Sequence, residues 1–175
     1  YYKRLHPLIS EAREQGNVHL KQAEVYYGRG LLAEAQEHLT MGLNLIGQPL
    51  PGTALQTQGG LIWEGMKQFV HQIWFAISPM PDRTEPGINK DDMELLRALE
   101  LVTSIDTLAN HVGPIDYYAG MKILNIAETA RCKSPILARA YASLALGMGH
   151  MPSPMDALAQ GYFRRAHTTL TGLDH

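Results

Sequence analysis

The sequence contains a single cysteine, Cys132, among its 175 residues. One thiol excludes a disulfide within the chain and every metal site that needs several thiolates. Scarcity of cysteine is also typical of proteins in a reducing compartment. We therefore expect a cytoplasmic protein.

The sequence also lacks clustered charge of one sign. Its 15 Lys and Arg are scattered and nearly balance 17 Asp and Glu, which leaves a net charge of −2. Proteins that bind nucleic acid concentrate basic residues on one face, so nucleic acid is not an expected partner. The longest apolar-leaning segment, 61–77, is interrupted by charged and amide residues and is too polar for a membrane span of about 20 apolar residues. We expect no membrane partner either.

Catalytic motifs are missing as well. The chain has no GxxxxGK[ST] phosphate loop and no GxSxG context around Ser134, Ser143 or Ser153. Cys132 lies in a basic stretch that favours a lowered thiol pKa, but a loop cysteine without a role is the simpler interpretation. We expect no catalytic residue, no cofactor and no enzyme activity in this chain.

Histidine is the one metal-binding residue type that is common here. The eight histidines form no HExxH motif and no pair spaced four residues apart, so we expect no metal site. Their positions are His6, His19, His38, His71, His111, His150, His167 and His175.

Helical periodicity runs through the whole chain, and no segment alternates with a period of two, which predicts an all-α fold. Glycine and proline separate about eight expected helices. The first ends at Gly16, and the others cover 18–28, 31–46, 61–77, 91–110, 115–131, 136–148 and 155–170. Residues 78–90 contain three prolines and few apolar anchors, so we expect a flexible loop there.

The segment 61–77 carries the most prominent apolar stripe. Two tryptophans widen the stripe, which predicts that this helix has neighbours on more than one side. The stripe consists of Ile62, Met66, Phe69, Val70, Ile73 and Ile77, and it is flanked by Trp63 and Trp74.

Three segments share one packing pattern, in which small residues alternate with aromatic or leucine residues at the crossing of two helices. They cover 17–51, 91–131 and 135–172; the first carries Ala23, Tyr26, Gly30, Ala35, Leu39 and Gly42. Each segment resembles a tetratricopeptide repeat. The resemblance implies antiparallel helical hairpins stacked as a solenoid, in a single domain over 1–175.

A narrower resemblance rests on the phrases HLTMGLNLIGQPLP, KILNIAETARCKSPILARAYASLALGMG and YFRRAHTTL. In this order they are similar to the C-terminal helical-repeat region of bacterial AAA-like signal-transduction ATPases and class III adenylyl cyclase-type multidomain proteins. The resemblance implies that nucleotide chemistry belongs to other domains. Because the first residue is Tyr1, we expect a fragment of a larger signalling protein.

The expected function is protein–protein interaction, with a protein, a peptide or other domains of the same chain as the partner. In tetratricopeptide arrays the first helices line the concave face, which implies a partner-binding groove, although the same positions would be buried if adjacent helices covered them. The groove residues are Asn17, Leu20, Glu24, Tyr27, Arg139, Ala142, Leu146 and His150. The alternative is a regulatory domain that binds a small molecule in an apolar pocket closed by Trp63, Phe69 and Trp74.

Overall fold

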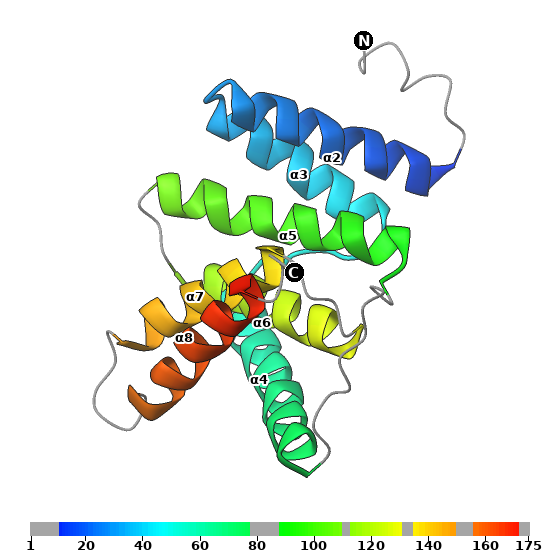
Figure 1. Cartoon of the computed structure of the whole chain (residues 1–175). Helices are drawn as coiled ribbons and strands as arrows, with labels where there is room; N and C mark the ends of the chain where they lie inside the picture. The colour runs from blue at the N-terminus through cyan, green and yellow to red at the C-terminus, as the bar shows by residue number, and fades with distance from the viewer. Residues whose placement is uncertain (1–10, 78–87, 110–112, 131–134, 150–155, 172–175) are drawn as a thin grey trace.

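The computed structural model describes residues 11–77, 88–109, 113–130, 135–149 and 156–171 (Figure 1). These residues form seven α-helices and contain no β-strand, which confirms the all-α prediction for the described part of the chain. The expected opening helix falls mainly on residues 1–10, and the expected loop falls mainly on 78–87. Both lie outside the described residues.

The first hairpin consists of α2 (Ala12–Gly28) and α3 (Leu32–Leu45). Gly30 has φ of +74°, a left-handed conformation that glycine adopts at little cost, and it lies in the turn between the helices. The prediction that a helix ends at Gly16 was wrong, because Gly16 lies inside α2. A Cβ atom on Gly42 would lie 3.0 Å from the carbonyl oxygen of Gly16, so both glycines serve the close crossing of α2 and α3.

Helix α4 (Ala54–Ile77) begins earlier than the sequence predicts. The hydroxyl of Thr53 accepts a hydrogen bond from the Gln56 backbone N–H at 3.2 Å, which satisfies a free donor at the start of the helix. The predicted helix began at residue 61, which left Gly59 and Gly60 outside it. Gly60 is instead needed for packing, since a Cβ there would lie 2.9 Å from the ring of Tyr118.

The remaining helices are α5 (Lys90–Leu108), α6 (Pro114–Thr129), α7 (Pro135–Gly149) and α8 (Asp156–Thr171). The side chain of Asn89 caps α5 by accepting the backbone N–H of Asp92 at 2.7 Å. The centre of the core lies where α5, α6 and α7 meet. Its most deeply buried leucines are Leu96, Leu99, Leu124 and Leu144.

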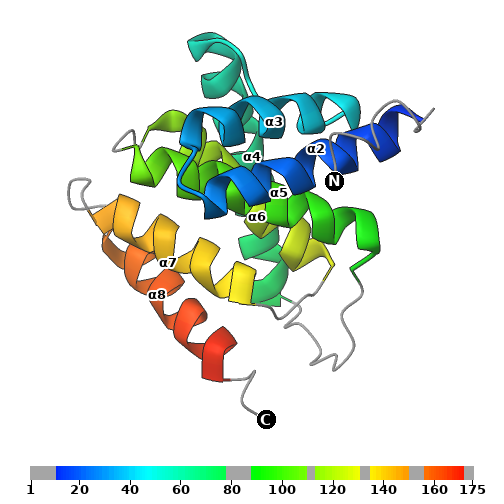
Figure 2. The same cartoon turned by 90° about the horizontal axis from the view of Figure 1, so that it is seen from above.

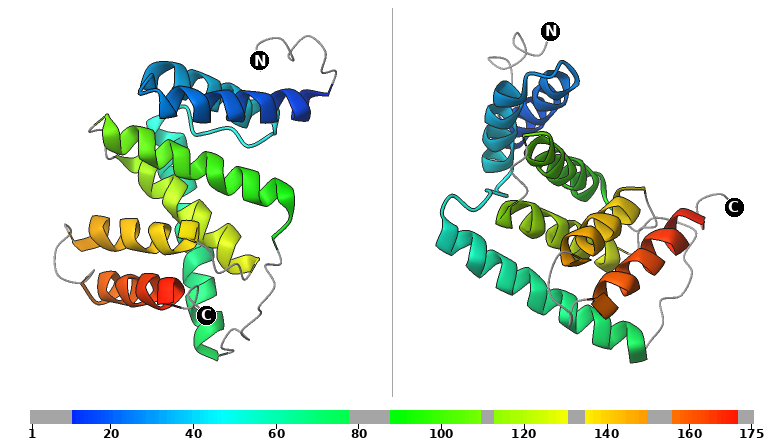
Figure 3. Two further views of the ribbon diagram at one scale, coloured as in Figure 1. Left: turned by 45° about the horizontal axis from the view of Figure 1, so that its top comes forward. Right: turned by 90° about the vertical axis from the view of Figure 1, so that its left-hand side faces the viewer.

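The helices are stacked along one direction (Figure 3). The α2–α3 pair lies at one end, α5 and α6 lie in the middle, and α7 and α8 lie side by side at the other end (Figures 1 and 2). Neighbouring layers touch through contacts of α3 with α5 and of α6 with α7. Helix α4 runs across this stack at the edge of the molecule and packs mainly on α6.

The two faces of α4 are reversed relative to an ordinary surface helix. Its polar side chains Glu64 and Gln68 are buried against the protein, whereas its apolar stripe is exposed. The predicted neighbours on more than one side are therefore absent from the described part of the chain. The physical reason is that the buried side chains of Asn125 and Glu128 on α6 pair with the polar face of α4. No helix among the described residues has the length and apolar character that crossing a membrane requires.

Candidate functional site

A groove of about 520 Å³ lies between α5, α6 and α7, with Tyr27 of α2 at its margin. Its floor is apolar and belongs to the core, through Ile123 and Ile136. Leu108 and Leu146, in contrast, line the groove while remaining more than half exposed. Pockets of this volume accept a drug-sized molecule or a few side chains of a peptide, so the groove is the main candidate site.

Charged side chains also line this groove. Arg139 of α7 forms an ion pair with Glu100 of α5, and both residues line the groove. Asp116 of α6 accepts the backbone N–H of Gly113 at 2.7 Å. Burial raises the pKa of the Asp116 carboxyl above its ordinary value, and the negative charge of Asp106 raises it further. The groove therefore combines an apolar floor with charged margins.

Three of the predicted groove residues line this groove. They are Tyr27, Arg139 and Leu146, which come from α2 and α7. Ala142 is half-buried and packs against the core, and His150 lies outside the described residues. The prediction thus included groove residues from both ends of the stack. It did not indicate that α5 and α6 supply most of the lining.

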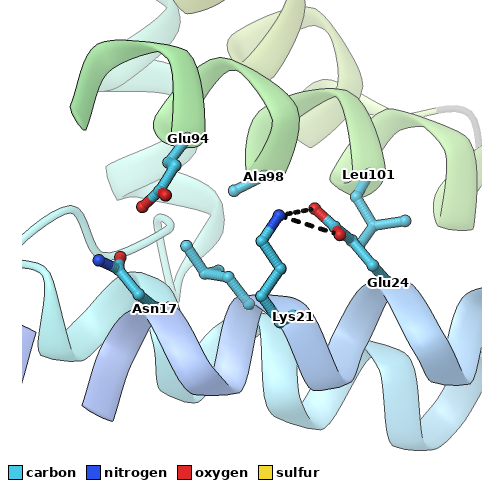
Figure 4. A pocket seen from close by; sticks show the side chains of 7 residues that line it. Asn17, Lys21, Glu24, Glu94, Ala98 and Leu101 are labelled. Carbon is cyan, nitrogen blue, oxygen red and sulfur yellow. Dashed lines mark hydrogen bonds and ion pairs between the residues drawn. The ribbon is translucent and has the colours of Figure 1, made fainter. Parts of the chain in front are cut away.

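The other predicted residues lie elsewhere. Asn17, Leu20 and Glu24 line a cavity of only about 10 Å³ between α2 and α5, which is barely one water molecule in size (Figure 4). Leu20 is buried in the core. Glu24 accepts two hydrogen bonds from Lys21, at 2.9 and 3.1 Å, within α2. In this part of the predicted groove Leu20 is therefore buried between α2 and α5, whereas Glu24 stays exposed.

A buried carboxylate on α6, Glu128, is the most prominent polar feature that the sequence did not reveal. Its side chain is 1% exposed, and it accepts hydrogen bonds from the Gln68 amide at 2.9 Å and from the Tyr141 hydroxyl. Arg165 of α8 lies 3.5 Å away, and His71 of α4 lies 3.4 Å away. Glu128 therefore joins α4, α6, α7 and α8 at one point.

A second buried pair continues this network along α4. The Asn125 amide donates to the Glu64 carboxylate at 2.7 Å and to the Glu64 backbone carbonyl at 2.9 Å. Lys67 lies 2.8 Å from the other carboxylate oxygen of Glu64. A polar stripe with helical spacing, Thr57, Glu64, Gln68 and His71, is the sequence signal that indicates a polar inner face.

The network shifts the titration of two tyrosines. Burial raises the pKa of Tyr141 above its ordinary value, and the negative charge of Glu128 raises it further. Tyr162 behaves in the same way, with burial again as the largest cause. Both hydroxyls stay protonated at neutral pH and can donate hydrogen bonds. The arrangement binds four helices together, and none of its residues lines the groove.

Two histidines that are far apart in the sequence lie next to each other across the first hairpin. The Nδ1 atoms of His19 and His38 lie 2.8 Å apart, and the ring of Tyr26 stacks on His38. No group of three or more His, Cys, Asp or Glu residues is placed to hold a metal ion in the part of the chain that the structure describes. Cys132 lies outside that part.

The small-molecule pocket expected from the aromatic residues of α4 is not formed among the described residues. Trp63, Phe69 and Trp74 are 57%, 67% and 62% exposed, and none of them lines the groove. Comparisons with protein-family models, curated proteins and solved structures found no match for this chain. Its function must therefore be inferred from its own geometry.

Proposed function

We propose that this chain is a non-catalytic helical module that binds a protein segment in the groove between α5, α6 and α7. The segment belongs to another protein or to another domain of the same polypeptide. The observation that supports this is the presence of exposed apolar side chains, Leu108 and Leu146, beside charged margins in one concavity. Helix-in-groove recognition uses this combination, with apolar anchors in the floor and polar contacts at the rim.

The charge of the groove indicates which kinds of side chain the bound segment carries. Arg139 and Glu100 neutralise each other as an ion pair, which leaves Asp116 as the unbalanced group in the lining. We expect the bound segment to place two apolar side chains near Leu108 and Leu146. A basic residue of the segment would then lie toward Asp116.

The wider setting of the module is part of the same proposal. We infer a tetratricopeptide-like solenoid of three hairpins in a single domain, within a cytoplasmic bacterial signalling protein that carries ATPase or cyclase domains elsewhere. Contacts between consecutive layers, α3 with α5 and α6 with α7, support a solenoid. Helix α4 departs from the repeat pattern, since it separates the first hairpin from the second.

A peptide selection tests the groove. A random peptide library is panned against the full chain, and each selected peptide is titrated by fluorescence anisotropy against wild type and Leu146→Asp. Leu170→Asp is the matched control, because Leu170 is 51% exposed on α8 and does not line the groove. We expect Leu146→Asp to weaken binding by about tenfold or more and the control to leave it unchanged. Equal weakening by both variants, or no selected peptide, contradicts the proposal.

A further inference from the structure

The exposed side of α4 is a continuous apolar surface. We define the α4 apolar face as eight residues, each between 47% and 76% exposed: Ile62, Trp63, Met66, Phe69, Val70, Ile73, Trp74 and Ile77. Large apolar and aromatic side chains offer about 150 to 250 Å² each, so this face leaves roughly 1,000 Å² of apolar surface in contact with water. The largest apolar patch of an ordinary monomer is only about 300 to 600 Å². This face is therefore suited to a partner.

The spacing along the face indicates the shape of that partner. Ile62, Met66, Phe69 and Ile73 follow one another in steps of four, three and four residues, which is the seam spacing of paired helices. A helix surface is convex and does not enclose a small molecule. The partner surface is therefore another helix that lies nearly parallel or antiparallel to α4.

The scarcity of charged residues on α4 also limits which kind of partner can bind its apolar face. Glu64 and Lys67 are the two charged residues of α4, and Glu64 is buried. Lys67 lies 2.8 Å from Glu64 and 5.6 Å from the centre of the Trp63 ring, so it is already paired. Helices that lie on lipid surfaces carry several Lys or Arg residues beside the apolar face, and α4 does not. Two copies of α4 would bring no like charges together.

We propose that the α4 apolar face binds the same face of a second copy of this chain, with the two α4 helices antiparallel. A two-fold axis between Met66 and Phe69 places Ile62 opposite Ile73 of the second copy and Met66 opposite Phe69 of the second copy. Each contact then occurs twice, as a closed two-fold dimer requires. The available area matches the approximately 800 Å² per partner of a stable interface.

The geometry also keeps this surface separate from the groove. No residue of α4 lines the groove, which is formed by α5, α6 and α7 with Tyr27 of α2. The dimer therefore leaves the groove free. The proposal does not depend on the function proposed for the groove.

Wild-type protein provides the first test. Sedimentation velocity over a hundredfold range of concentration should show twice the 19.4 kDa mass of one chain, shifting to the single mass on dilution. Both tryptophans of the chain lie on the α4 apolar face, so their emission should shift to the red as the dimer dissociates. A single-chain mass with constant emission at every concentration overturns the proposal.

Two variants locate the interface. Phe69→Asp should raise the dimer dissociation constant by about 30-fold or more, because each copy carries the buried charge. Leu170→Asp should leave it unchanged, and circular dichroism should show the same helicity in both. A dimer that survives Phe69→Asp undiminished overturns the proposal. So does a monomer that sediments with phosphatidylcholine vesicles and loses this binding in Phe69→Asp, which would assign the face to lipid. Peptide binding in the groove should be the same in Phe69→Asp as in wild type.

Discussion

Replacing Glu128 with alanine should destabilise the protein more than any exposed glutamate substitution. Glu128 accepts hydrogen bonds from Gln68 and Tyr141, and Arg165 lies 3.5 Å away. Alanine removes the shared acceptor and leaves buried donors without a partner. Each buried donor left without an acceptor costs about 1 to 3 kcal/mol, and there are two of them, Gln68 and Tyr141. Glutamine at the same position keeps the volume and one acceptor, so we expect about 1 to 2 kcal/mol.

Urea unfolding followed by far-ultraviolet circular dichroism, at one protein concentration, measures the loss of unfolding free energy in both variants. The matched control is Glu100→Ala, since Glu100 also pairs with an arginine but at the surface, where such pairs contribute about 0 to 1 kcal/mol. A double-mutant cycle of Glu128→Ala with Gln68→Ala should give a coupling energy of about 0.5 to 3 kcal/mol. The reasoning is refuted if Glu128→Ala costs no more than Glu100→Ala.

The remaining predictions concern pH and packing. The raised pKa of Tyr141 means that the folded protein holds this proton at a pH where the unfolded chain has released it. The unfolding free energy should therefore fall as the pH rises above about 10, the ordinary tyrosine pKa, and Tyr141→Phe should reduce that slope in urea titrations. Gly42→Ala should lower the unfolding free energy, because the new Cβ would lie 2.7 Å from a methyl carbon of Leu20 and 3.0 Å from the Gly16 carbonyl oxygen. Gly161→Ala, where nothing lies within 4 Å, should instead raise it by about 1 kcal/mol, and equal effects of the two changes would contradict the close crossing.

Helix positions followed from local chemistry, and most could be predicted. The cap at Asn89 and the turn at Gly30 act within a few residues, so their signals are complete in the sequence. Gly16 and Gly60 misled the prediction for one reason. A glycine that ends a helix and a glycine that admits a neighbouring helix look alike until the neighbour, Gly42 or Tyr118, is in place.

The groove could be predicted only in part. The geometry implied by the tetratricopeptide resemblance assigned Tyr27, Arg139 and Leu146 to a groove, and all three line this one. Leu20 was assigned to the same face but is covered by α5, because the tilt between successive layers is decided by packing rather than by repeat spacing. The contribution of α5 and α6 follows from that same packing.

Helix α4 shows which features the sequence determined by itself and which features only the tertiary structure decided. The sequence alone specified an amphipathic helix with an apolar stripe and a polar stripe, since both depend only on the helical repeat. Which stripe faces the protein depended on Asn125 and Glu128, about 60 residues away along the chain. Their buried amide and carboxylate require polar partners, so the polar side of α4 turned inward. The apolar side was left outward, where it offers a surface to a second copy.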